Sequence, residues 1–227
     1  MTKSIFITAT GTDVGKTYIT GLLAKKLNEN GFNTGYYKSA LSGAYYDSNN
    51  NLIVGDAQHV KDTAHLDDTI EEMVSYVYKN AVSPHLATKL EGNPLELERV
   101  KSDFKKISQK HDYMLVEGSG GIVCPIRYDD TQKIFLEDII KALNLDTIVI
   151  ADAGLGTINY TVLTIKYMNS IGIKSKGIIL NHWTGSTMEL DNVKMIEDIT
   201  KVPVIATVED DCSNIQIDCN RLISLFS

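Results

Sequence analysis

The chain has 227 residues, of which 22 are Lys or Arg and 29 are Asp or Glu, which gives a formal net charge of −7. This acidic balance argues against a protein that binds nucleic acid or an anionic membrane, because such binding depends on clustered positive charge. Hydrophobic residues make up 43% and charged residues 22%, so the chain can bury a globular core. We expect one domain over residues 1–227, since open α/β folds of about this length are often a single unit.

No targeting or membrane segment is expected. The amino-terminal residues lack a basic region followed by a long apolar run, and no later stretch approaches about 18 uninterrupted apolar residues. The three cysteines are too few and too scattered for a disulfide framework or a four-ligand zinc site. We therefore expect a cytoplasmic protein with reduced thiols.

Short β-rich apolar runs alternate along the chain with longer segments of helical period. This alternation predicts an α/β fold, with a doubly wound and mostly parallel sheet flanked by crossover helices. The predicted strands are residues 4–9, 34–38, 113–117, 147–151, 177–181 and 204–208. The predicted helices are residues 16–29, 95–109, 136–143, 158–171 and 188–200.

Residues 42–94 form the exception to this alternation. The segment is polar, rich in Asn and Tyr, and only weakly periodic, so it predicts an elaborated crossover with an exposed turn at residues 47–51. A solvated loop and an active-site insertion fit this composition equally well.

The strongest local signal is Ala-Thr-Gly-Thr-Asp-Val-Gly-Lys-Thr at residues 9–17, between an apolar strand and an amphipathic helix. Gly15 can let backbone amides close around phosphate oxygens, Lys16 supplies charge to the outer phosphates, and Thr17 can ligate magnesium. The usual motif has a glycine where this chain has Thr10. The strand-loop-helix context nevertheless predicts a nucleotide site at the first βα turn.

Charged residues at strand ends could serve these phosphates. Glu117 ends a strand and precedes a glycine-rich turn, which suggests a direct or water-bridged magnesium ligand. Asp56 is a lone acid in a loop, and from the sequence alone a helix N-cap is its favoured role. Lys38 ends the second strand and would project over the same edge of the sheet as Lys16. Two lysines there suggest a polyanionic or carbamate-like intermediate, although an ordinary surface lysine fits equally well.

A series of short motifs spans almost the whole chain. In order they are Asp13-Val-Gly-Lys-Thr17, Tyr37-Lys38 with Ser42-Gly43, Gly55-Asp56-Ala57, Ser83-Pro-His85, Val116-Glu-Gly-Ser-Gly-Gly121, Gly154-Leu-Gly-Thr-Ile-Asn159 and Asn181. In this order and register they resemble the motifs of ATP-dependent dethiobiotin synthetases. The resemblance implies a P-loop NTPase fold, with ATP as co-substrate and Mg²⁺ as cofactor.

The activity implied by the resemblance is a cyclo-ligase reaction of biotin biosynthesis. Enzymes of this family close the ureido ring of dethiobiotin from 7,8-diaminopelargonic acid, carbon dioxide and ATP, and they release ADP and phosphate. A substrate amine takes up carbon dioxide as a carbamate, the carbamate oxygen attacks the γ-phosphorus, and the second amine displaces phosphate from the mixed anhydride.

The resemblance also implies roles for individual residues. Lys16 and Lys38 would be catalytic, and Thr17, Asp56 and Glu117 would hold the metal. The nucleotide would contact Asp13, Val14, Gly15, Lys16, Thr17, Tyr18, Asp56, Glu117, Gly118, Ser119, Gly120, Asn181 and His182. The diamine would contact Thr12, Ser42, Gly154, Leu155, Gly156, Thr157, Ile158 and Asn159. In the family the 154–159 turn receives the carboxylate tail of a substrate held mainly by the neighbouring subunit, which implies a homodimer with sites at the interface.

Three positions depart from the family's usual pattern. Ala9 replaces the first glycine of the loop, Ser39 follows the lysine where a proline is common, and Glu209-Asp210 replaces a Pro-Trp pair near the adenine. The resemblance therefore does not extend to the purine contacts of that last loop, and strict preference for ATP stays open.

Two other classes share the phosphate loop. Partitioning or septum-positioning ATPases carry an extra lysine early in this loop, and none lies between Phe6 and Val14. Amide-forming synthetases of the cobyrinic acid type continue into a glutaminase domain, which we do not expect here because the sequence ends at Ser227. ATP-dependent synthesis of a small molecule is therefore the favoured function.

Overall fold

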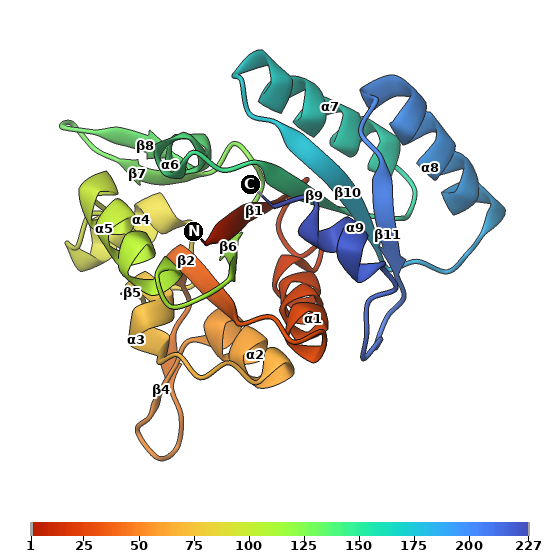
Figure 1. Ribbon diagram of the computed structural model, residues 1–227. Helices are drawn as coiled ribbons and strands as arrows, with labels where there is room; N and C mark the ends of the chain where they lie inside the picture. The colour runs from red at the N-terminus through yellow and green to blue at the C-terminus, as the bar shows by residue number, and fades with distance from the viewer. Residues whose placement is uncertain (1, 227) are drawn as a thin grey trace.

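The computed structural model describes residues 2–226 and is built around a seven-stranded parallel sheet (Figure 1). The strand order is β11-β10-β9-β1-β6-β2-β5, which agrees with the predicted fold class. The domain expected over 1–227 includes Met1 and Ser227, which lie outside the described residues. The sheet strands are β1 (Lys3–Ala9), β2 (Thr34–Ser42), β5 (Val74–Tyr78), β6 (Tyr113–Glu117), β9 (Thr147–Asp152), β10 (Ser175–Asn181) and β11 (Val204–Val208).

Helices and two small hairpins complete the fold. The helices are α1 (Lys16–Glu29), α2 (Gly55–Ala64), α3 (Ile70–Met73), α4 (Pro84–Glu91), α5 (Leu97–Ser108), α6 (Leu136–Leu143), α7 (Thr157–Ser170), α8 (Thr187–Thr200) and α9 (Cys219–Ile223). The hairpins pair β3 (Tyr45–Tyr46) with β4 (Leu52–Ile53), and β7 (Pro125–Tyr128) with β8 (Lys133–Phe135). Within the part of the chain described, no helix combines the length and the apolar character that a membrane crossing requires.

Successive side chains of β2 point to opposite faces of the sheet, and this alternation decides which of them can reach the candidate active site. Tyr37 donates a hydrogen bond to the carbonyl oxygen of Val100 on α5 at 3.1 Å. Its neighbours Tyr36 and Lys38 point to the other face, which carries α1 and α2. A lysine and a tyrosine two residues apart therefore share one face and can meet groups supplied by both helices.

The prediction for residues 42–94 was incomplete. The segment expected as an elaborated crossover contains α2, α3, α4 and the edge strand β5, and β2 extends through Ser42 to pair with β5. These elements are short, and β5 pairs only with β2 in the sheet, so their apolar patterns are brief. The exposed turn at 47–51 is confirmed, with the Asp47 amide donating to the Asn51 carbonyl at 3.0 Å. The β7–β8 hairpin and α9 were not predicted either.

Candidate active site

A cavity of about 1100 Å³ opens at the carboxyl ends of β1, β2 and β6. In open α/β sheets this edge is where ligands bind. The site residues predicted from the sequence that line it are Thr12, Asp13, Gly15, Lys16, Thr17, Tyr18, Lys38, Ser42, Asp56, Glu117, Ser119 and Gly120. The structure thus brings together residues from four separate motifs.

The phosphate loop turns sharply into α1. Gly15 has a φ of 87° and Asp13 a φ of 59°, both in the left-handed region that turns successive amides inward. The Lys16 ammonium donates to the Gly11 carbonyl at 3.1 Å, so it lies over the loop. Asn181, at the end of β10, donates its side-chain amide to the Val14 carbonyl at 3.2 Å and supports the loop from the other side.

We expect Gly15→Ala to weaken nucleotide binding at least about tenfold, because the left-handed conformation costs an L-residue about 1–2 kcal/mol and the new methyl group has no space. A Cβ at Gly15 would lie 2.2 Å from Nδ2 of Asn181. Titration with a fluorescent ADP analogue measures the affinity. Gly11→Ala is the matched control, since no atom lies within 4 Å of a Cβ at Gly11. Equal affinity of the two variants would contradict the packing argument.

Lys38 is the centre of a buried ion cluster. Its ammonium donates to Asp56 at 2.5 Å and to Glu117 at 2.6 Å, and the residue is only 3% exposed. The surface interpretation of Lys38 is therefore wrong. The N-cap interpretation of Asp56 is also wrong, because Val54 is the N-cap of α2 and Asp56 lies in the first turn of that helix. The carboxylate is thus directed at Lys38 and benefits from the positive end of the helix dipole.

Glu117 gathers three donors around one buried carboxylate. The Thr17 hydroxyl donates at 2.8 Å and the Tyr36 phenol at 3.1 Å, in addition to Lys38. The Tyr36 contact with Glu117 was not predicted from the sequence. Its signal would have been the alternation along β2, which puts it on the same face as Lys38. Tyr36 therefore fixes the orientation of Glu117.

Burial and charge shift the pKa values of these groups in opposite directions. Burial and the nearby Lys38 ammonium lower the pKa of Lys16. Burial alone would lower the pKa of Lys38, but the adjacent Glu117 and Asp56 carboxylates outweigh it and raise that pKa. Burial would raise the pKa of Asp56, but Lys38 outweighs it and the pKa falls. Lys38 and Asp56 are therefore held charged at neutral pH.

The far part of the cavity, beyond Lys16 and Thr17, includes the predicted residues Ser42, Ser119 and Gly120 and several that were missed. Ser42 was expected to bind the substrate, and its buried hydroxyl oxygen has no hydrogen-bond partner among the described residues, so it is available to a ligand. The residues missed as cavity lining are Gly55, His59, Ala81, Val82, Ser83, Pro84 and Cys124. Burial raises the pKa of the Cys124 thiol to about 11, so the thiol stays protonated.

Several predicted residues lie outside this cavity. Gly118 does not line the cavity: its amide donates to the Ile7 carbonyl at 2.9 Å within the sheet, and a Cβ there would clash with Leu136 and Phe6. This packing requires a glycine, and a contact of Gly118 with the nucleotide stays a prediction. Val14 also does not line the cavity. Asn181 and His182 lie beyond the phosphate loop. The 154–159 turn lies at the end of β9.

The 154–159 turn has the features expected of a helix start. Gly156 is the N-cap of α7 with a φ of 94°, and Leu155 is 90% exposed. Asn192 of α8 donates to the carbonyls of Ala153 and Gly154, and the Gly154 amide donates to the Asp152 carboxylate. Leu155, Gly156 and Asn159 are exposed whereas Thr157 is buried, and none of residues 154–159 lines the cavity of its own chain.

Known proteins similar to this chain decide its family. It is 54% identical over 227 residues to the ATP-dependent dethiobiotin synthetase BioD of Brachyspira hyodysenteriae, covering 100% of both chains. The chain belongs to the ATP-dependent dethiobiotin synthetase family. It is also 48% identical over 209 residues to the enzyme of that name from Clostridium perfringens, covering 92% of this chain and 91% of the other. The AAA domain family matches residues 3–214. The resemblance inferred from the motifs is thus confirmed.

Similarity to solved structures concerns the fold alone. The cell division protein complex MinC:MinD of Aquifex aeolicus superposes with a TM-score of 0.55 at 16% identity, covering 92% of this chain and 82% of that one. The P-loop NTPase fold implied by the resemblance is confirmed by this likeness.

Proposed function

We propose that this protein is a cyclo-ligase that makes dethiobiotin from 7,8-diaminopelargonic acid, carbon dioxide and ATP, and that the cavity at the carboxyl ends of β1, β2 and β6 is its active site. The observation that carries the proposal is the 54% identity to a dethiobiotin synthetase over the full length of both chains. The geometry of the cavity supplies the roles of the individual residues.

The two substrates divide the site at the phosphate loop. The buried Oδ1 of Asn181 has no hydrogen-bond partner among the described residues, so it can accept a hydrogen bond from the exocyclic amine of adenine. The loop from Thr12 to Thr17 cradles the phosphates. The cavity continues beyond Lys16 and Thr17 to Ser42, Ser83 and Cys124, and there the diamine lies next to the γ-phosphate.

A magnesium ion fits the donors present. Thr17, Asp56 and Glu117 offer a hydroxyl and two carboxylates at one end of the cavity, and Mg²⁺ binds through one or two carboxylates together with substrate phosphates. When bound, the ion would neutralise charge on the β- and γ-phosphates. We assign these three residues to hold it.

The Lys38 ammonium serves both halves of the reaction. The substrate amine attacks carbon dioxide and loses a proton, which leaves a carbamate anion that Lys38 can pair with. The carbamate oxygen then attacks the γ-phosphorus as ADP leaves, and Lys16 and Lys38 stabilise the negative charge on the transferring group. Finally the second amine attacks the carbonyl carbon, loses a proton and expels phosphate, which closes the ureido ring.

The test of the activity is the dependence of ATP turnover on each small molecule. Phosphate release should require magnesium, bicarbonate and 7,8-diaminopelargonic acid together, and it should fall to background when any of them is omitted. ATP turnover that does not depend on the diamine and rises when a macromolecular partner is added would contradict the proposal. It would favour a switch ATPase with the same fold.

The displayed 154–159 turn supports a site shared between two subunits. Its amide-rich helix start suits a carboxylate, yet it does not line the cavity of its own chain. A homodimer in which this turn of one subunit reaches the cavity of the other would let it hold the carboxylate tail of the diamine. Exposed apolar side chains on α7, including Tyr160 and Leu163, are suited to such an interface.

Mixing two inactive variants tests the shared site. Lys38→Met removes the ammonium, and Asn159→Glu places a repelling carboxylate in the turn. In a mixed dimer the cavity of the Asn159→Glu subunit keeps its own Lys38 and receives the intact turn of the other subunit. Random exchange of subunits should therefore recover about a quarter of the wild-type activity. No recovery, with exchange verified by native mass spectrometry, would place both residues in the site of a single subunit.

A further inference from the structure

Two short segments outside the sheet form walls of the far part of the cavity. The α4 wall is residues 82–84, at the start of α4, and the β6–β7 wall is residues 119–124, before β7. Neither segment belongs to a sheet strand. The ends of the β6–β7 wall are held by hydrogen bonds from Ser119 to the Ala40 carbonyl and from the Leu136 amide to the Cys124 carbonyl. Beyond these contacts, the position of each wall depends on the element that comes next in the chain. The α4 wall continues through α4 into the connection at 93–96, and the β6–β7 wall continues into the β7–β8 hairpin.

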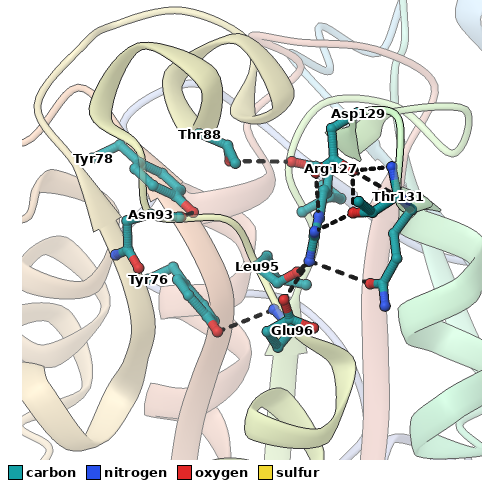
Figure 2. A network of polar contacts seen from close by, with 11 residues as sticks. Tyr76, Tyr78, Thr88, Asn93, Leu95, Glu96, Arg127, Asp129 and Thr131 are labelled. Carbon is teal, nitrogen blue, oxygen red and sulfur yellow. Dashed lines mark hydrogen bonds and ion pairs between the residues drawn. The ribbon is translucent and has the colours of Figure 1, made fainter.

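Arg127 on β7 joins these two continuations (Figure 2). Its Nη1 donates to the Leu95 carbonyl at 3.3 Å and to the Glu96 carboxylate, both in the 93–96 connection. Its other donors reach the hairpin turn, with Nε 2.5 Å from Asp129 and Nη2 2.8 Å from Thr131. The residue is buried, with 7% of its surface exposed. One side chain thus ties the segment behind one wall to the segment behind the other.

The 93–96 connection is also fastened to the sheet edge (Figure 2). Tyr78 of β5 donates to the Asn93 carbonyl at 2.7 Å, and the hydroxyl of Tyr76 accepts from the Glu96 amide at 3.0 Å. Thr88 in α4 makes a longer contact, 3.4 Å, to the Ile126 carbonyl of β7. With Arg127 in place, α4 is therefore bound to the sheet on one side and to β7 on the other.

A guanidinium suits this position for a physical reason. It presents a planar fork of donors, and here that fork meets a backbone carbonyl, a hydroxyl and two carboxylates at once. The hydrogen bond from Arg127 lowers the pKa of Asp129, which keeps that carboxylate ionised. Without the arginine, the Glu96 and Asp129 carboxylates would be left near each other with no cation between them.

We propose that Arg127 is a positioning residue for the diamine, because its fork locks the α4 wall and the β6–β7 wall in the arrangement that the far part of the cavity requires. This inference rests on the proposed function, which puts the diamine between these walls. The phosphate loop lies against the β6–β7 wall at Gly120 and Gly121. Its hydrogen bonds, however, run to Asn181, β9 and α1, and none of them involves Arg127. Loss of the arginine should therefore weaken binding of the diamine and spare binding of the nucleotide.

Steady-state kinetics of Arg127→Met separates these effects. We expect the KM for 7,8-diaminopelargonic acid to rise about tenfold, because displacement of about 1 Å at a site can cost up to about a hundredfold, while the Kd for MgADP stays within about twofold. Arg99→Met is the matched control. Arg99 stacks on Tyr76 at 4.4 Å and donates to Ser75, which ties α5 to β5 and neither wall to the other. Its KM for the diamine should stay at the wild-type value.

Arg127→Lys keeps the charge without the fork and covers the case in which Arg127→Met does not fold. It should show a clear but smaller rise in the KM for the diamine. A folded Arg127→Lys variant with the wild-type KM for the diamine would overturn the proposal. Equal losses of affinity for the diamine and for MgADP in either Arg127 variant would also overturn it.

Thiol labelling gives a readout that does not need the proposed reaction. Cys124 lies in the β6–β7 wall and is buried, whereas Cys212 and Cys219 lie elsewhere and are partly exposed. In Arg127→Met we expect Cys124 to react with a maleimide about tenfold faster, because a looser wall opens more often, with unchanged rates at the other two. Unchanged labelling of Cys124 would refute the wall-locking role, whereas absence of diamine-dependent turnover in the wild type would refute only the proposed function.

Discussion

Lys38→Met should abolish dethiobiotin formation to less than about one-hundredth of the wild-type rate, since one lost charge-stabilising group costs about 3 kcal/mol of transition-state stabilisation. The buried ammonium bridges Asp56 and Glu117, and no other cation among the described residues contacts both carboxylates. The measurement is the kcat for phosphate release with saturating diamine, bicarbonate and MgATP.

The fold of the Lys38 variant needs a separate check, because removing the lysine leaves two carboxylates facing each other at a buried site. Lys38→Met/Glu117→Gln relieves that repulsion and should be better folded but equally inactive. Lys106→Met, at an exposed position on α5, should keep wild-type activity. Substrate-dependent turnover within a few fold of the wild type in a folded Lys38→Met would show that phosphoryl transfer takes place elsewhere.

Lys16→Met should lose at least about a hundredfold in kcat and, unlike Lys38→Met, should also lose affinity for ATP. Lys16 lies over the phosphate loop and contacts the Gly11 carbonyl, whereas Lys38 belongs to the cluster on β2 and β6. Isothermal titration with ATP, together with the kinetic assay, separates binding from chemistry.

Lys26→Met tests whether a lysine-to-methionine change on α1 is harmful in itself. It lies on the same helix more than two turns from Lys16, and it should bind ATP as the wild type does. If Lys16→Met and Lys38→Met had the same ATP affinity, the assignment of ATP binding to Lys16 and not to Lys38 would be wrong.

The central strands could be predicted because their side chains are buried almost completely, and the helices because they space their apolar residues at a helical period. The predicted helix at residues 16–29 matches α1 residue for residue, since Gly15 and Gly31 mark its ends. The edge strand β5 could not be predicted in the same way. Its Val-Ser-Tyr-Val-Tyr sequence lies within a polar segment, and its pairing depends on the continuation of β2 through Ser42.

The site was predictable in its residues but not in their contacts. The phosphate loop carries its chemistry in consecutive positions, so Lys16 and Thr17 follow from the sequence. Lys38, Asp56 and Glu117 come from three distant segments, and only the fold shows that one ammonium joins both carboxylates. Arg127 had no sequence signal, because its partners lie on two separate loops.

The sheet and the phosphate loop are compatible with both a switch ATPase and a ligase, so the distinction between these functions depends on the far part of the cavity. In this chain that part offers the available Ser42 hydroxyl and two walls tied together by Arg127. These features suit a small bound molecule. Because the fold alone is compatible with both functions, the full-length identity to dethiobiotin synthetases decides between them.

The most direct test of the account is the fate of labelled bicarbonate. The protein would be incubated with ATP, magnesium, 7,8-diaminopelargonic acid and ¹³C-bicarbonate, and both dethiobiotin and phosphate would be quantified. The account predicts dethiobiotin with the label in its ureido carbon, formed in equal amount to phosphate, and neither product in excess of background from Lys38→Met. Phosphate released without labelled dethiobiotin would contradict it.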